Sequence, residues 1–193
     1  MKKRMLAALL ALLVLLLSGC GVTEGRRKVV INANLAGTAT FAFGTDTPGE
    51  GVDVTGSIIT QKDKTDAVVT ILAHIQSGEE HQEGVSFYAK KGWVVTNVLT
   101  DYPADGNEDQ KYNNAVIVKT ATAESDWAYI VEFGCDRTAA VPGAEGDVMI
   151  ELTWNYGSFE PDSFDLLACV GAGYPSGTTA DGKTAVEVSI PLD

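Results

Sequence analysis

Apolar and polar residues alternate along most of the chain beyond residue 28. In several short runs every second side chain is apolar, and these runs cover residues 29–35, 69–75, 85–89, 127–133, 148–156 and 186–190. Successive side chains of a β-strand point to opposite faces, so this period of two indicates antiparallel strands with one buried face. The apolar side chain at each second position is therefore expected in the core.

Turn-forming residues separate the runs. Clusters rich in Gly, Pro, Asp and Ser stand at 47–51, 61–65, 77–80, 103–107, 142–146, 175–177 and 181–182. Short strands with such regular turns are typical of an all-β sandwich, with a barrel as the alternative. Residues 66–75 would also fit an amphipathic helix, but their β-branched residues favour a strand. We therefore predict an all-β fold, an antiparallel β-sandwich of about nine or ten strands.

Some phrases of the sequence add a resemblance to this pattern. Residues 84–88, 92–97 and 186–191 resemble immunoglobulin-like sandwich modules of exported bacterial proteins. The resemblance implies an immunoglobulin-like sandwich and favours a binding module over an enzyme.

The N-terminus carries a targeting signal. Lys2, Lys3 and Arg4 precede an apolar run over 6–17, which is too short for a permanent membrane span, and Leu-Ser-Gly-Cys follows at 17–20. This order resembles a bacterial lipoprotein precursor with its lipobox. The resemblance implies that Cys20 is acylated, for example with palmitate, and becomes the first residue of the mature protein. A plain secretory signal and an uncleaved N-terminal helix are the alternatives.

These features divide the chain into three parts. We expect a signal peptide at 1–19, the lipidated Cys20 with a short tether at 20–28, and one β-sandwich domain at 29–193. The eight tether residues after Cys20 span at most about 28 Å when extended, which keeps the domain near the membrane. The basic residues at 26–28 either contact anionic head groups or begin the domain as a solvated charge run. We expect the extracytoplasmic face of the cell membrane.

The charge balance limits the partners. Asp and Glu number 26 against 14 Lys and Arg, a formal net charge of −12, and removal of a basic signal peptide makes it more negative. Such a surface repels phosphate backbones, so we predict that the protein does not bind nucleic acid.

Besides Cys20, the mature region contains two cysteines. Cys135 shares the parity of Trp127 and Phe133 and is expected to point inward, whereas apolar neighbours leave the direction of Cys169 open. In an oxidising exterior the two would form a disulfide. The alternative is a pair of buried thiols that behave as small hydrophobic residues.

Residues suited to catalysis are few. The sequence has no Gly-x-Ser-x-Gly, no Cys-x-x-Cys and no dinucleotide or phosphate-binding fingerprint. The two histidines are His74, on the outward parity of its strand, and His81, in a glutamate-rich loop. We therefore predict that the protein is not an enzyme.

Two groups of residues are candidates for ligand binding. Five oxygen donors would suit Ca²⁺, although they also fit a plain acidic loop; they are Asp101, Asp105, Asn107, Glu108 and Asp109. No other cofactor is expected. Tyr156 and Tyr174 are candidate exposed aromatics for stacking against a sugar, whereas Trp127 and Trp154 continue apolar faces and are expected in the core.

Together these observations predict a membrane-anchored extracytoplasmic lipoprotein. Its partners would be membrane lipid, through acylated Cys20, and an unknown protein or glycan ligand bound by the β-sandwich without catalysis. The alternative is an exported carbohydrate-binding or carbohydrate-hydrolysing accessory protein that uses carboxylates. A structural envelope component with a membrane-protein partner is a third hypothesis.

Overall fold

The structure is a computed structural model. It describes residues 34–45, 51–63, 66–78, 84–102, 116–120, 126–134, 143–155, 161–171 and 184–192. The described residues contain no helix with the length and apolar character needed to cross a membrane.

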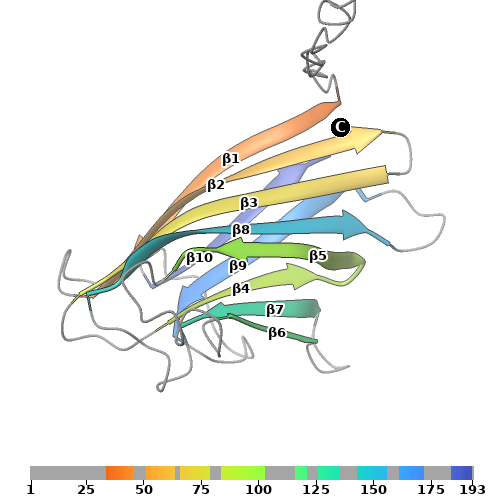
Figure 1. Cartoon of the computed structure of the whole chain (residues 1–193). Coiled ribbons are helices and arrows are strands. Elements are labelled where there is room, and N and C mark those ends of the chain that lie inside the picture. The colour runs from red at the N-terminus through yellow and green to blue at the C-terminus, as the bar shows by residue number, and fades with distance from the viewer. Residues whose placement is uncertain are drawn as a thin grey trace, which may run out of the picture. The chain divides into compact units, whose positions relative to one another are not determined.

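Ten strands make up the described part of the domain. They are β1 (Leu35–Gly44), β2 (Val52–Asp63), β3 (Asp66–Ser77), β4 (Val85–Lys90), β5 (Trp93–Thr100), β6 (Val116–Thr120), β7 (Trp127–Phe133), β8 (Glu145–Trp154), β9 (Ser163–Val170) and β10 (Ala185–Pro191). The first sheet has the order β1-β2-β3-β8-β5 and the second β10-β9-β4-β7-β6, with antiparallel pairing between the described neighbours (Figure 1). The prediction of an all-β, antiparallel β-sandwich of about nine or ten strands is confirmed.

The strand boundaries refine the prediction at its N-terminal end. Residues 66–75 belong to β3, so the strand interpretation of this stretch is confirmed. The turn predicted at 61–65 is shorter, because β2 continues to Asp63 and β3 begins at Asp66. Most of the alternating run at 29–35 lies outside the described residues, and the first described strand begins at its last residue, Leu35.

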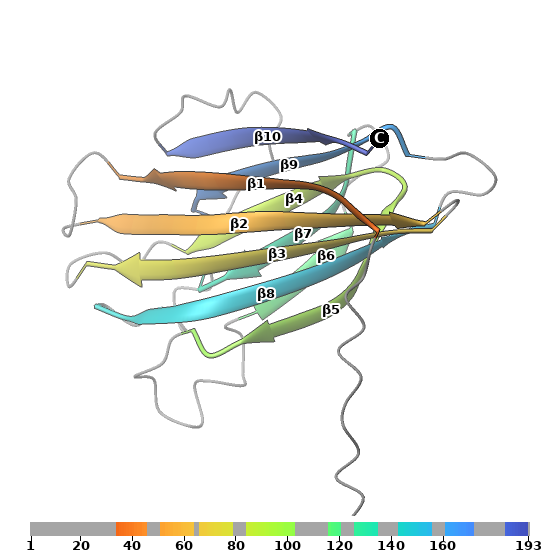
Figure 2. The ribbon, with the colours of Figure 1, turned by 90° about the horizontal axis from the view of Figure 1, so that it is seen from above.

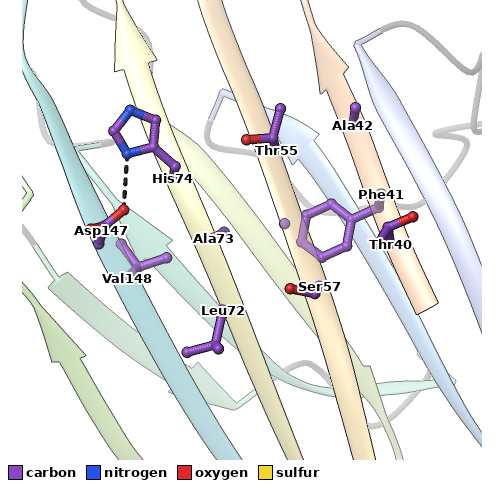
Figure 3. Close-up of a pocket in the computed structure, with 11 residues that line it drawn as sticks. Thr40, Phe41, Ala42, Thr55, Ser57, Leu72, Ala73, His74, Asp147 and Val148 are labelled. Atoms are coloured by element: carbon purple, nitrogen blue, oxygen red, sulfur yellow. Dashed lines mark hydrogen bonds and ion pairs between the residues drawn. The ribbon is translucent and has the colours of Figure 1, made fainter. Parts of the chain in front are cut away.

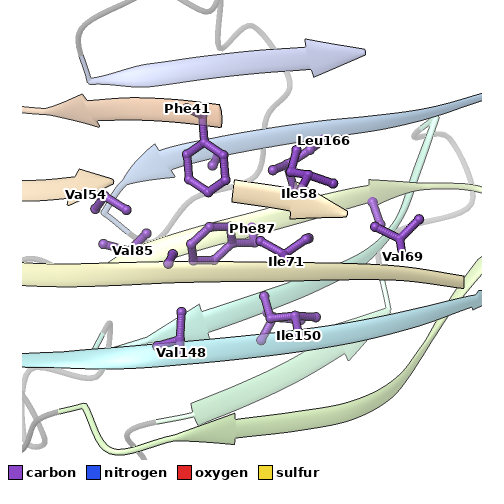
Figure 4. Close-up of a cluster of buried hydrophobic side chains, with 14 of the residues drawn as sticks. Phe41, Val54, Ile58, Val69, Ile71, Val85, Phe87, Val148, Ile150 and Leu166 are labelled. Carbon is purple, nitrogen blue, oxygen red and sulfur yellow. The ribbon is translucent and has the colours of Figure 1, made fainter. Parts of the chain in front are cut away.

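The two sheets bury their facing sides against each other. In β3 the side chains of Val69, Ile71, Ala73 and Ile75 are buried, as the alternation predicts, and the residues between them point outward. The larger buried side chains form an aromatic layer between the sheets, in which the ring of Phe87 meets those of Phe41, Phe43 and Phe133. Figure 4 shows the rings of Phe41 and Phe87 in this layer. Each fully buried side chain of this size stabilises the fold by about 1.5–3 kcal/mol.

One side of the sandwich is closed where β1 packs against β10, as Figure 2 shows from above. The Lys62 ammonium donates to the Leu192 carbonyl over 2.8 Å. On the inner side of β1, Thr60 donates its hydroxyl proton to the Gly37 carbonyl over 3.0 Å. The edge strand β1 is therefore covered.

Gly56 makes room for an aromatic side chain in the first sheet. It lies directly opposite Phe41 on β1 and Ala73 on β3. A Cβ atom at this position would lie 2.3 Å from the tip of the Phe41 ring and 2.6 Å from the Leu72 carbonyl oxygen. Only a residue without a side chain fits here, and Phe41 fills the space on the inner face.

We expect Gly56→Ala to destabilise the domain by about 1–3 kcal/mol, because the added methyl group displaces the Phe41 ring or the β3 backbone. Urea denaturation followed by tryptophan fluorescence measures this loss. Thr55→Val, an exposed substitution one residue away, should change the free energy of unfolding by less than about 0.5 kcal/mol. Equal stability of the Gly56→Ala variant and the wild type would contradict the proposed packing.

Candidate functional site

The outer face of the first sheet carries an open depression with a volume of about 810 Å³. Residues of β1, β2, β3 and β8 line it, including Thr40, Thr55, Ser57, Leu72 and His74 (Figure 3). His74 points outward from β3, as its parity in the sequence predicts.

The depression follows from the sizes of outward side chains in two neighbouring cross-strand rows. The strand registers give one row as Ala42, Thr55, His74 and Asp147, and the other as Thr40, Ser57, Leu72 and Met149. On β1 and β2 these side chains are small, whereas on β3 and β8 they are larger. The depression therefore lies over β1 and β2, where hydroxyl groups are exposed. The larger side chains of β3 form its wall.

His74 and Asp147 form a polar pair at the wall of the depression. The His74 Nδ1 atom lies 2.9 Å from the Asp147 Oδ1 atom, and the two side chains are 47% and 78% exposed. In Figure 3 the imidazole and the carboxylate point toward each other across β3 and β8. This pair offers both donors and an acceptor to a polar ligand.

A tight corner after β5 holds Asp147 in place. The Asp147 amide donates to the Asp101 Oδ1 atom over 2.6 Å, and the Thr100 hydroxyl donates to the Asp147 carbonyl over 3.0 Å. A Cβ atom on Gly146 would lie 2.7 Å from the Tyr102 amide nitrogen, so only glycine allows this approach. The corner fixes the β8 backbone that carries the Asp147 carboxylate.

Asp101 is the one member of the predicted Ca²⁺ cluster in the described part of the chain. Its carboxylate accepts the hydrogen bond from the Asp147 amide. The other candidates, Asp105, Asn107, Glu108 and Asp109, lie outside the described residues. Among the described residues no group of three or more His, Cys, Asp and Glu side chains is placed to hold a metal ion. The Ca²⁺ site stays a prediction.

The depression combines apolar surface, such as that of Leu72, with hydrogen-bonding groups. Its described lining contains one carboxylate, Asp147, one imidazole, His74, and the hydroxyl groups of Thr40, Thr55 and Ser57. Glycoside hydrolysis uses a pair of carboxylates on either side of the scissile bond, and this lining provides one. The arrangement suits the binding of a polar ligand.

Trp127 does not lie in the core between the sheets, so that prediction was wrong. A register shift between Ala89 and Lys90 places Trp127 opposite Lys90, on the outer face of the second sheet. There Trp127 is half-buried, and its ring packs edge-on against Tyr88 at 6.4 Å between centroids. Because the bulge adds one residue, the side chain at the start of β7 points to the opposite face. Counting alternate positions in the sequence does not reveal such a bulge. Trp154 packs against Trp93 and the core, as predicted.

Cys169 lies on the same outer face of the second sheet. Its thiol is buried in a cluster with Tyr88, Ile130, Leu167 and Ala185, and it is a free cysteine in this structure. Burial raises the pKa of the Cys169 thiol and also that of the Tyr88 hydroxyl, which lies 4.0 Å away. Cys135 lies outside the described residues, so the disulfide stays a prediction.

The remaining candidate residues also lie outside the described residues. They are Cys20, His81, Tyr156 and Tyr174. The residues that the depression uses instead, such as Thr55, Ser57 and Leu72, carry no motif. They share only an outward position on adjacent strands, and this follows from the register rather than from the sequence of any one strand.

An ion pair joins two strands on the outer face of the second sheet. The Lys90 Nζ atom lies 3.1 Å from the Asp165 Oδ2 atom and 5.7 Å from the centre of the Trp127 ring. Burial raises the pKa of the Asp165 carboxyl, but hydrogen bonds from Ser189 and Lys90 and the Lys90 charge outweigh it, so the pKa is lowered overall. The folded state therefore favours the ionised carboxylate.

Several solved structures are similar to this chain at low identity. A mutant of Streptococcus suis SadP matches with 9% identity and a TM-score of 0.42, over 81% of this chain and 98% of the other. The Streptococcus suis adhesion Fhb matches with 9% identity and a TM-score of 0.42, over 82% and 100%. The collagen-binding domain of a Staphylococcus aureus adhesin matches with 10% identity and a TM-score of 0.35, over 79% and 96%.

Sequence comparison assigns no family. No family model matches the chain, and the search of curated proteins found no match. The identities and TM-scores of the structural matches are too low to assign a function.

The Lys90–Asp165 pair predicts a specific loss of stability in acid. Because the folded-state pKa of Asp165 is lowered, its contribution is fully present above the unfolded pKa of about 4 and is lost as the pH falls through the folded pKa. Asp165→Asn should therefore lower the free energy of unfolding at pH 7 and make its decline below about pH 4 shallower than that of the wild type. Urea denaturation at a series of pH values measures both effects.

Glu187→Gln is the matched control, because Glu187 is an exposed carboxylate on the outer face of the same sheet. This variant should keep a stability close to that of the wild type at pH 7. If Asp165→Asn and the wild type lose stability in parallel on acidification, the ion pair does not stabilise the fold in this way.

Proposed function

We propose that the protein is a membrane-anchored extracytoplasmic lipoprotein that binds a protein or glycan ligand through the outer face of its first sheet, without catalysis. The observation that carries the proposal is the open depression over β1, β2, β3 and β8. It is open, its lining combines apolar side chains with the hydroxyl groups of Thr40, Thr55 and Ser57, and the His74–Asp147 pair borders it. Apolar surface with a few polar groups is typical of ligand-binding sites.

The order of the N-terminal segments supports the anchoring. A basic start, an apolar run at 6–17 and the lipobox at 17–20 follow one another as in bacterial lipoprotein precursors. In this proposal Cys20 carries the lipid, residues 20–28 form the tether, and the domain of residues 29–193 lies near the membrane. Two or three acyl chains hold such a domain firmly, since each buried methylene contributes about 0.8 kcal/mol.

The composition of the depression supports binding more than hydrolysis. A sugar or a peptide presents hydroxyl, amide or carbonyl groups, which Thr55, Ser57 and the His74–Asp147 pair are able to hydrogen-bond. The described lining holds a single carboxylate, which does not support the carbohydrate-hydrolysing alternative.

We expect labelled palmitate to enter the full chain when it is produced in a bacterial host with lipoprotein-processing enzymes. Cys20→Ala should abolish the label and leave an unprocessed precursor, because the thiol is the acceptor of the lipid. Fluorography after membrane fractionation measures both. A labelled Cys20→Ala variant, or an unlabelled wild type, would exclude anchoring at this residue.

We expect a photo-crosslinking amino acid at position 55, in the depression, to capture a ligand in the native cell. The same amino acid at position 187, on the outer face of the second sheet, is the matched control and should not capture it. Mass spectrometry of the adducts separates a protein from a glycan. Identical adducts from both positions, or none from position 55, would refute binding at the depression.

A further inference from the structure

In the described part of the chain, the edge strand β5 lacks the charged residues and prolines that often protect a sheet edge, although a register shift between Val95 and Asn97 interrupts its pairing near the start. Its eight residues, Trp93–Thr100, contain no charged residue and no proline. In the described part of the chain it pairs with β8 on one side and with no strand on the other. By contrast, the edge strand β10 carries Glu187 and Pro191, which discourage strand addition.

The backbone register shows which groups of β5 face the open edge. The Asp101 amide donates to the Asp147 carbonyl over 3.1 Å, so residue 101 directs its main-chain groups toward β8. In an antiparallel pair, every second residue directs its main-chain amide and carbonyl toward the neighbouring strand. Counting back from residue 101, Leu99 and Asn97 therefore also direct these groups toward β8. The amides and carbonyls of Val98 and Thr100 therefore point away from β8, where an added strand would bond to them.

The outward side chains beside this edge alternate between acidic and apolar rows. Asn97 is paired with Glu151, and Leu99 is paired with Met149, which is paired in turn with Leu72. The third row contains Asp101 and Asp147. Leu99 and Leu72 are 57% and 41% exposed. A carboxylate thus lies on each side of an exposed apolar row.

We propose that β5 binds an extended segment of a partner protein, added as a strand, whose outward residues follow the order basic, apolar, basic at every second position. The apolar residue would lie beside Leu99, and the basic residues beside Asn97 and Asp101. From a position beside Asn97, a Lys or Arg side chain reaches over this short residue toward the Glu151 carboxylate. Main-chain hydrogen bonds supply affinity in this mode, and alternate side chains supply specificity.

The charge of the molecule favours this partner over a second copy of the chain. The formal net charge is −12, and the rows beside β5 contribute Glu151, Asp101 and Asp147. Two copies paired through β5 would bring these carboxylates together without a basic residue on either β5 strand. The inference rests on the proposed function, because it names the class of ligand for the same face of the first sheet.

The test uses the full chain in detergent micelles and three fluorescently labelled peptides. One contains Lys-Thr-Val-Thr-Lys, one contains Glu-Thr-Val-Thr-Glu, and one contains the residues of the first in the order Lys-Lys-Thr-Thr-Val. Fluorescence anisotropy should show binding of the first peptide at least about tenfold tighter than of the other two, and the binding should weaken with salt. Equal binding of the first and third peptides would mean simple charge attraction and would overturn the proposal.

Variants locate the binding on the molecule. Leu99→Lys and Glu151→Lys should each weaken the binding of the first peptide about tenfold or more, because each substitution places a positive charge beside the basic residues of the peptide. Val118→Lys on the exposed edge strand β6 and Glu187→Lys on β10 add the same charge changes elsewhere and should leave binding unchanged. Circular dichroism should show that all four variants are folded. Equal loss in test and control variants would overturn the proposal.

Three further outcomes test this inference and its premise separately. If sedimentation shows a dimer that Leu99→Lys dissociates, the occupant of the edge is a second copy, and the inference is wrong. If position 55 captures a ligand in cells but the alternating peptide does not bind, the inference fails and the proposed function stands. If the peptide binds at β5 while position 55 captures nothing, the edge is a binding site, and the depression is not.

Discussion

Burial of the two inner faces against each other is the constraint on which the rest of the structure depends. Phe87 on β4 meets Phe41 and Phe43 across the space between the sheets, so the position of each strand is tied to the side chains opposite it. A shift of one residue in β1 or β2 would move Phe41 off Gly56 and turn apolar side chains to water. The strand registers are therefore strongly specified by the core. The same registers determine which side chains are neighbours on the outer faces.

The outer face of the first sheet is a consequence of those registers. Because Phe41, Gly56, Ala73 and Val148 form one inward row, the rows on either side of it point outward and place Thr55 beside His74 and Ser57 beside Leu72. Further along, the same registers put Met149 between Leu72 and Leu99, next to the edge strand β5. The depression and the edge strand thus belong to one continuous surface, which explains why a single face is the candidate for ligand binding.

The second sheet uses its outer face differently. Tyr88, Ile130 and Leu167 are buried there although they point away from the core between the sheets, and Lys90 is held between Asp165 and the Trp127 ring. Its buried outer side chains and its ion pair contribute to stability. The outer face of the first sheet instead carries exposed hydroxyl-bearing residues on β1 and β2 and acidic residues on β8.

The sequence by itself determined the fold class and the inward side of most strands, because a period of two with frequent turns leaves few alternatives to a sandwich. Val69, Ile71 and Ile75 illustrate this, since each is buried as its parity predicts. Only the tertiary structure decided which outward residues are neighbours, because pairs such as His74 with Asp147 and Leu99 with Met149 depend on strand order and register. It also placed Trp127 on the outer face, since a bulge shifts parity by one residue and leaves no mark in the alternation.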